Sequence, residues 1–147
     1  MRDWLRRELG RRPWWMNALM LHCAYMTFVY VPRDLLGPSA TAEEVWFGVL
    51  FHGATAKLLE FPHWLVYGAG LYGFWRMRAW MWPWAALYTA QVAFSSAVWI
   101  TLNRGGTEAA GGIGISAVIA FVALQLWRSR ERFQLSADAD ARDPRAD

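Results

Sequence analysis

The basic residues of this chain are gathered at its two ends and in one short turn, and the stretches between them are almost free of charge. A helix that crosses a bilayer needs about 20 consecutive, mostly apolar residues. Four stretches approach this requirement, at about 14–31, 57–75, 82–102 and 113–127. The charge pattern therefore predicts an all-α, polytopic membrane protein with four transmembrane helices.

The residues before the second span are amphipathic rather than fully apolar. Thr41 and Glu44 have the spacing of a capping box, in which two side chains satisfy the free N–H groups of a helix start. We therefore expect an amphipathic or re-entrant helix at 43–56, followed by a break or kink at Pro62. The glycine-rich segment 103–112 is expected to be a polar loop between the last two spans.

With 147 residues the chain has room for one domain. We expect a basic amphipathic segment at 1–13, a four-helix transmembrane domain at 14–128, and a charged, disordered cytoplasmic tail at 129–147.

Orientation follows from the positions of Lys and Arg. Ten of these residues flank one side of the predicted spans, whereas Arg33, Lys57 and Arg104 lie on the other. Because cytoplasmic loops carry the excess of Lys and Arg, both termini are predicted in the cytoplasm. The short basic loops suit a bacterial inner membrane protein, and an endoplasmic reticulum protein would look similar. The net charge of +3 is accounted for by these flanking residues, so no nucleic-acid partner is expected.

Ionisable side chains inside apolar spans are the first candidates for function, because placing them in lipid costs a few kcal/mol or more. His22 lies in the middle of the first span, and Glu60 lies next to the Pro62 kink. His63 follows Glu60 by three residues, so the two share one helical face. Glu-x-x-His motifs bind metals when two copies meet in a helical bundle. Because the chain has a single copy, we expect no metal and no cofactor.

Each of these residues also has a structural interpretation. Glu60 can pair with Lys57 or His63 at the membrane interface, and His22 can hydrogen bond within the first span. Gln91 gives the third span an unusual polar group. Deep aromatic side chains, among them Tyr67, Tyr88 and Trp99, can either pack the helices or line an apolar pocket.

Taken in order, several features resemble the emopamil-binding (EXPERA) family of four-helix membrane proteins, which includes sterol isomerases and sigma-2 receptor-like proteins. The features are His22, then Asp34-Leu35-Leu36-Gly37, Trp46, Glu60, the basic turn Phe74-Trp75-Arg76-Met77-Arg78, Ala90-Gln91-Val92 and Val98-Trp99. The chain departs from the isomerases of that family in two places. It has Tyr25 and Met26 where they carry an acid one turn after the histidine, and it lacks their Asn/Trp pair in the last span.

The resemblance implies an intramembrane pocket for a sterol-like or other lipidic small molecule. It also implies a Δ8–Δ7 double-bond isomerase, in which His22 and Glu60 are the catalytic proton relay. Together with the residue patterns, it predicts a ligand-binding set of Tyr25, Asp34, His63, Tyr67, Tyr88, Gln91 and Trp99.

Two other functions remain open. The chain is alternatively a non-catalytic subunit or assembly factor of a larger membrane complex, or a homo-oligomer, and exposed stripes of small residues without a cavity would favour this. It is otherwise a small proton-coupled transporter with Glu60 in its pathway, which proton counter-transport would reveal. In every case membrane lipids are expected partners.

Overall fold

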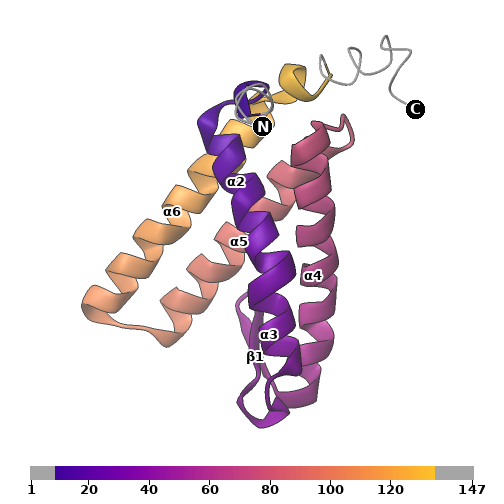
Figure 1. The fold of residues 1–147 in the computed structure, drawn as a ribbon. Coiled ribbons are helices and arrows are strands. Elements are labelled where there is room, and N and C mark those ends of the chain that lie inside the picture. The colour runs from indigo at the N-terminus through magenta and orange to yellow at the C-terminus, as the bar shows by residue number, and fades with distance from the viewer. Residues whose placement is uncertain (1–8, 135–147) are drawn as a thin grey trace.

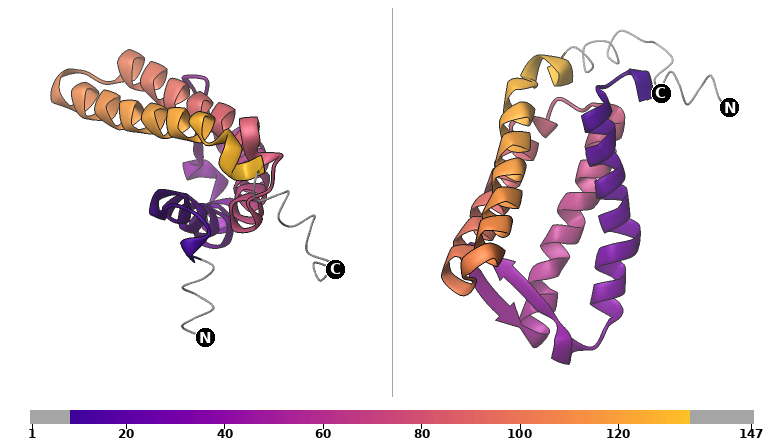
Figure 2. Two further views of the ribbon diagram at one scale, coloured as in Figure 1. Left: turned by 90° about the horizontal axis from the view of Figure 1, so that it is seen from above. Right: turned by 90° about the vertical axis from the view of Figure 1, so that its left-hand side faces the viewer.

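Residues 9–134 are described in the computed structural model, and they are mostly helical, as predicted (Figure 1). One continuous helical arm is built from α2 (Trp14–Tyr25), the π-helical segment η1 (Met26–Tyr30) and α3 (Val31–Leu36). The helix α4 (Gly53–Arg76) returns beside this arm. A second helical hairpin consists of α5 (Met81–Asn103) and α6 (Gly106–Arg128). Figure 2 shows the two helical pairs side by side, with a two-stranded sheet between them at one end.

The first arm continues past Val31, where the sequence predicted its end. The π-helical turn explains how the helix accommodates Pro32, because the Val31 N–H bonds to the Met26 carbonyl instead of the Thr27 carbonyl. The next N–H in the π pattern would come from Pro32, which has none. The indole Nε1 of Trp64 on α4 donates to the Thr27 carbonyl instead, at 2.8 Å. A side chain from the neighbouring helix therefore satisfies the carbonyl that Pro32 cannot serve.

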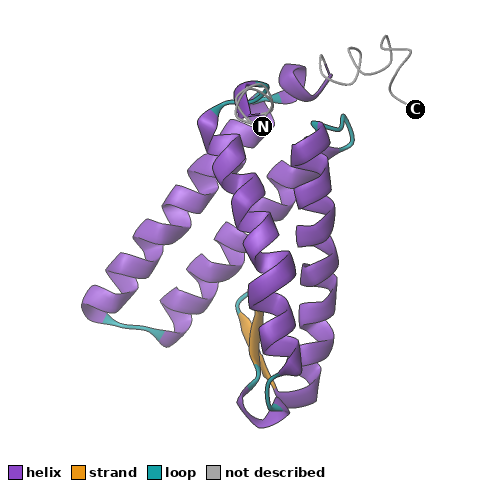
Figure 3. Cartoon of the chain, in the orientation of Figure 1, coloured by secondary structure: helices purple, strands orange, loops and turns teal. Residues whose placement is uncertain are grey.

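The predicted helix at 43–56 is wrong. The strands β1 (Glu43–Trp46) and β2 (Val49–His52) pair antiparallel there (Figure 3). The two connecting residues have positive φ angles, 49° at Phe47 and 85° at Gly48, as a two-residue hairpin turn of type I′ requires. The valine and aromatic residues of this segment favour strands, and this preference prevails over the capping-box spacing.

Helix α4 begins at Gly53 and runs through Pro62 without interruption. Helix α6 begins at Gly106, so the predicted loop at 103–112 is wrong and only Arg104 and Gly105 separate the last two helices. Glu108 lies in the first turn of α6, where its negative charge is favourable, and it pairs with Arg104 at 3.1 Å. Small residues also let α6 approach α5 closely, which offsets the low helix propensity of glycine.

The buried core lies where α2 and α5 begin and α4 and α6 end. Its largest members include Met16, Phe74, Met81, Leu126 and Phe133. Phe133 belongs to a helical turn at 130–134, so the disorder expected from residue 129 onward does not extend to these residues. Most of the predicted segment at 1–13 and the tail beyond 134 lie outside the described residues.

Two described helices, α5 and α6, are long and apolar enough to cross a membrane. Only 17% of the apolar window of each is buried, and both helices carry exposed large apolar side chains. Exposed residues of this kind include Phe94, Ile115 and Phe121. Outward-facing apolar helices suit a lipid environment, because an apolar surface of this size is unfavourable in water. The α2 arm and α4 do not meet the same criterion.

Candidate ligand-binding site

Two adjoining cavities lie between the helical pairs. The larger has a volume of about 770 Å³ and the smaller about 220 Å³. Four residues line both of them, namely Tyr67, Tyr88, Gln91 and Val92. The two spaces therefore meet at a shared wall formed by α4 and α5.

The larger cavity is lined almost entirely by apolar and aromatic side chains. Leu19 and Cys23 contribute from α2, Val66 from α4, Leu87 from α5 and Ile119 from α6. The aromatic turn of the β-hairpin closes part of the wall through Trp46 and Phe47. Within the part of the chain that the structure describes, no lysine, arginine, aspartate or glutamate lines this cavity. A wall of this composition suits an apolar, uncharged molecule.

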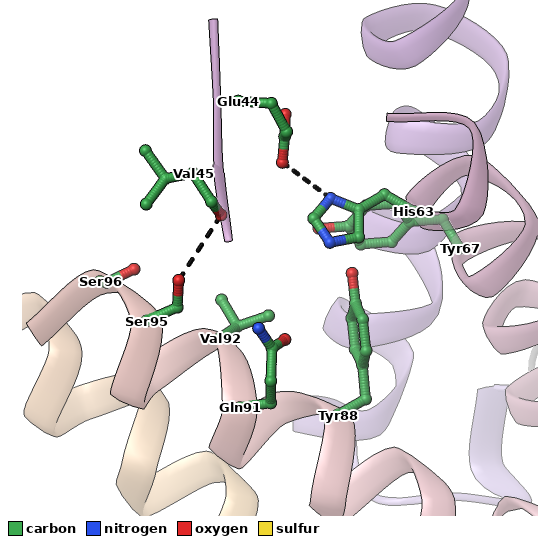
Figure 4. A pocket seen from close by; sticks show the side chains of 9 residues that line it. All are labelled: Glu44, Val45, His63, Tyr67, Tyr88, Gln91, Val92, Ser95 and Ser96. Carbon is green, nitrogen blue, oxygen red and sulfur yellow. Dashed lines mark hydrogen bonds and ion pairs between the residues drawn. The ribbon is translucent and has the colours of Figure 1, made fainter. Parts of the chain in front are cut away.

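The smaller cavity is lined by both polar and apolar side chains, and His63 forms part of its wall (Figure 4). Its Nδ1 lies 2.9 Å from Oε1 of Glu44, which strand β1 brings across to α4. The indole of Trp46 stacks on the imidazole, with ring centroids 4.4 Å apart and planes 13° from parallel. A carboxylate on one ring nitrogen and an indole against one ring face fix the orientation of the histidine.

Nε2 of His63 is buried in this pocket without a hydrogen-bond partner among the described residues. The hydroxyl group of Tyr88 is also buried, and it interacts with the side chain of Tyr67. In Figure 4 the Tyr88 hydroxyl points toward the His63 ring. The two rings meet edge to face at 5.9 Å. Unpaired buried polar atoms are uncommon in native proteins, so Nε2 of His63 marks a place where a polar group can bind.

Ser95 holds the β-hairpin in position rather than facing a ligand. Its hydroxyl accepts a hydrogen bond from the Gly48 N–H at 3.3 Å and donates to the Val45 carbonyl at 3.5 Å. Because these bonds fix β1 against α5, they also set the position of Glu44 opposite His63. The Ser95 hydroxyl is therefore occupied by a structural role.

A chain of edge-to-face aromatic contacts connects the two cavities. His22 packs on Tyr67 at 5.8 Å, Tyr67 on Tyr88 at 6.1 Å, and Tyr88 on His63 at 5.9 Å. The structure thus brings five of the predicted residues to the walls of one site: His22, His63, Tyr67, Tyr88 and Gln91.

The other four predicted residues line neither cavity, namely Tyr25, Asp34, Glu60 and Trp99. Glu60 is buried and interacts with Asp34 and Lys57. Tyr25 is half exposed and packs near Tyr30. Trp99 lies under Arg104, whose guanidinium is 5.3 Å from the indole. The predicted relay partners His22 and Glu60 therefore do not share a cavity.

Lys57 has a structural role. Its ammonium group donates to the carbonyls of Leu35 and Gly37 at the end of α3. A positive charge is favourable at a helix C-terminus.

Sequence reasoning missed Glu44 as a site residue. The capping-box spacing assigned it to a helix start, and it lies on a strand instead. The aromatic and β-branched residues around Phe47-Gly48 are the signal that could have identified the hairpin and placed Glu44 across from α4.

Among residues 9–134, no group of three or more His, Cys, Asp and Glu side chains could hold a metal ion. No protein-family model, curated protein or solved structure matches the chain.

Proposed function

We propose that this chain is an integral membrane protein that binds a sterol-like or other lipidic small molecule in the cavity between its helical pairs. The observation that supports the proposal most is the 770 Å³ apolar cavity with a polar pocket at one wall. Sites for small molecules commonly measure a few hundred to about 1,000 Å³ and combine apolar walls with a few converging polar groups.

The proposal includes four membrane crossings with both termini in the cytoplasm of a bacterial inner membrane. The first arm, helical from Trp14 to Leu36, would measure roughly 35 Å at about 1.5 Å per residue, enough for a hydrocarbon core of about 30 Å. Helix α4 has 24 residues, which also suffices. Its charged residues Lys57 and Glu60 both have partners on α3, which are the Leu35 carbonyl for Lys57 and Asp34 for Glu60. Large apolar side chains such as Phe28 and Leu65 face outward from both elements.

The resemblance to sterol isomerases suggests that the ligand is a substrate, and we treat that as a narrower hypothesis. Proton relocation needs an acid and a base beside the bound ring system. His22 lines the cavity but Glu60 does not, so the contacts favour ligand binding over a His22–Glu60 relay. A Δ8-sterol conversion assay with His22→Gln and Glu60→Gln tests the relay directly, and product formed equally by the wild type and both variants would exclude it.

Photo-crosslinking tests the binding proposal. The purified protein in lipid nanodiscs would be irradiated with a diazirine-bearing sterol and, in parallel, a diazirine-bearing polyisoprenoid alcohol, and modified residues would be mapped by mass spectrometry. We expect at least one probe to label the cavity-lining residues Val92 and Ile119, with labelling lost under excess unlabelled competitor. Labelling confined to the outward residues Phe94 and Phe121 would refute an internal site.

A further inference from the structure

We infer that the Glu44–His63 pair binds a single uncharged hydroxyl group at one end of the ligand, which makes the ligand a neutral lipid alcohol. This inference rests on the proposed function and specifies its ligand class.

The Glu44 contact determines which hydrogen-bonding role His63 offers to a ligand. A carboxylate 2.9 Å from Nδ1 accepts a hydrogen bond, so Nδ1 carries a proton, and we take the imidazole in its neutral form. The other ring nitrogen of a neutral imidazole is then an acceptor. That atom, Nε2, is buried in the pocket and has no partner among the described residues. A ligand group that completes this site must donate a hydrogen bond.

Burial makes this requirement stringent. The His63 side chain is only 14% exposed, and Trp46 covers one face of its ring. Leaving a buried acceptor without a partner costs more free energy than a typical hydrogen bond contributes. A ligand that has no donor for Nε2 therefore binds more weakly. The Tyr88 hydroxyl, which is directed toward the ring, can bind the oxygen of the same ligand group.

The charge of the pocket excludes an anionic head group. No lysine or arginine lines either cavity in the described part of the chain, and the only carboxylate present is that of Glu44. A phosphate placed beside His63 would be buried next to a negative charge with no cation to balance it. A cationic head group is disfavoured for a different reason, because taking an ammonium group out of water costs far more than taking out a hydroxyl group, and the one carboxylate here already accepts a hydrogen bond from His63.

The two spaces adjoin at their shared wall, and the inferred ligand spans both. Tyr67, Tyr88, Gln91 and Val92 border the polar pocket and the apolar cavity together. A ligand whose hydroxyl group binds His63 would therefore place its apolar body between the helical pairs. An amphiphile with one small polar end and no charge matches this division.

Three ligands with one hydrocarbon chain test the inference. The protein in nanodiscs would be loaded with tritiated geranylgeraniol, and the label displaced by unlabelled geranylgeraniol, its methyl ether or its monophosphate. We expect the alcohol to displace the label at least about ten-fold more effectively than either analogue, which corresponds to one lost hydrogen bond at a buried acceptor. Geranylgeranylamine, added as a fourth competitor, should also be weaker than the alcohol.

The same hairpin offers a matched control. His52 and Glu43 form a similar pair at 3.4 Å, but both side chains are more than 60% exposed. His63→Phe keeps an aromatic ring against Trp46 and should abolish the preference for alcohol over ether, whereas His52→Phe should retain it. Glu44→Gln should weaken the preference and Glu43→Gln should not, which tests the pair by a second route if His63→Phe does not fold.

The outcomes separate this inference from the proposed function. Equal binding of alcohol and ether by the wild type, or tighter binding of the phosphate or the amine, would overturn the neutral-alcohol assignment and leave a lipid-binding cavity in place. Failure of the wild type to retain the labelled alcohol, together with absent cavity labelling in the photo-crosslinking experiment, would overturn both.

Discussion

The indole of Trp64 substitutes for an N–H that Pro32 cannot supply, and this predicts an energetic coupling between two residues on different helices. Trp64→Phe removes the donor to the Thr27 carbonyl and keeps an aromatic ring. Pro32→Ala restores a backbone N–H five residues after Thr27, in the position that the π-helical pattern requires.

The expected magnitude follows from the contact. The Trp64–Thr27 bond measures 2.8 Å and is partly buried, so its loss should destabilise the protein by about 1–2 kcal/mol, most of it from the unpaired carbonyl. In the Pro32→Ala background the carbonyl has a backbone donor of its own. The same Trp64→Phe change should then cost about 1 kcal/mol less, and this difference is the coupling energy.

Unfolding by SDS in mixed micelles, followed by circular dichroism, measures the four variants of this cycle. Trp14→Phe is the control, because Trp14 is 80% exposed and should change stability by less than about 0.5 kcal/mol. If the effects of Trp64→Phe and Pro32→Ala on stability are additive, the indole of Trp64 does not replace the missing N–H of Pro32.

Three further predictions concern the packing that shapes the cavity. Arg12 is buried and donates to the Phe74 and Trp75 carbonyls at the end of α4, at 2.8 and 2.7 Å; Arg12→Ala should lower stability by about 2–3 kcal/mol in the same unfolding assay, and an unchanged midpoint would contradict this role. Gly48→Ala places a side chain at positive φ against α5 and should destabilise the hairpin by at least about 1–2 kcal/mol, whereas Gly105→Ala, which has open space, should be mild; equal effects would argue against a docked turn. A valine side chain at Gly112 would meet Ile100 on α5, whereas one at Gly111 has open space within 4 Å. Gly112→Val should therefore lower the free energy of unfolding by about 1–3 kcal/mol more than Gly111→Val. A larger loss for Gly111→Val would exclude this close contact.

The helices could be predicted from the sequence because charge segregation and length are local properties. The apolar runs located the four long helices, including the crossings proposed for α2 and α4, and the aromatic positions Tyr67 and Tyr88 were expected at a pocket. Helix ends were less well predicted. Pro32 and the glycines after Asn103 normally terminate helices, and here a π-helical turn and close α5–α6 packing override them.

The polar site could not be derived from the sequence, because it depends on a tertiary contact between segments 19 residues apart in different elements. Glu44 faces His63 only because the 43–52 segment forms a hairpin whose turn docks on α5 through Ser95. The capping-box spacing around Glu44 favoured a helix, which would have directed its carboxylate elsewhere. Glu60 shows the opposite case, since a charged residue in an apolar span was expected at the site and lies beside Asp34.

A substitution that fills the cavity tests its role most directly. Ala69 on α4 and Ala90 on α5 are both exposed, but Ala69 lines the apolar cavity and Ala90 lines neither cavity. Retention of tritiated geranylgeraniol in nanodiscs would be compared for the wild type, Ala69→Phe and Ala90→Phe, with the unfolding midpoint of each as a check on the fold. The cavity account predicts that Ala69→Phe lowers binding at least about ten-fold with little change in stability, and that Ala90→Phe binds like the wild type. Wild-type binding by Ala69→Phe, or equal losses in both variants, would contradict it.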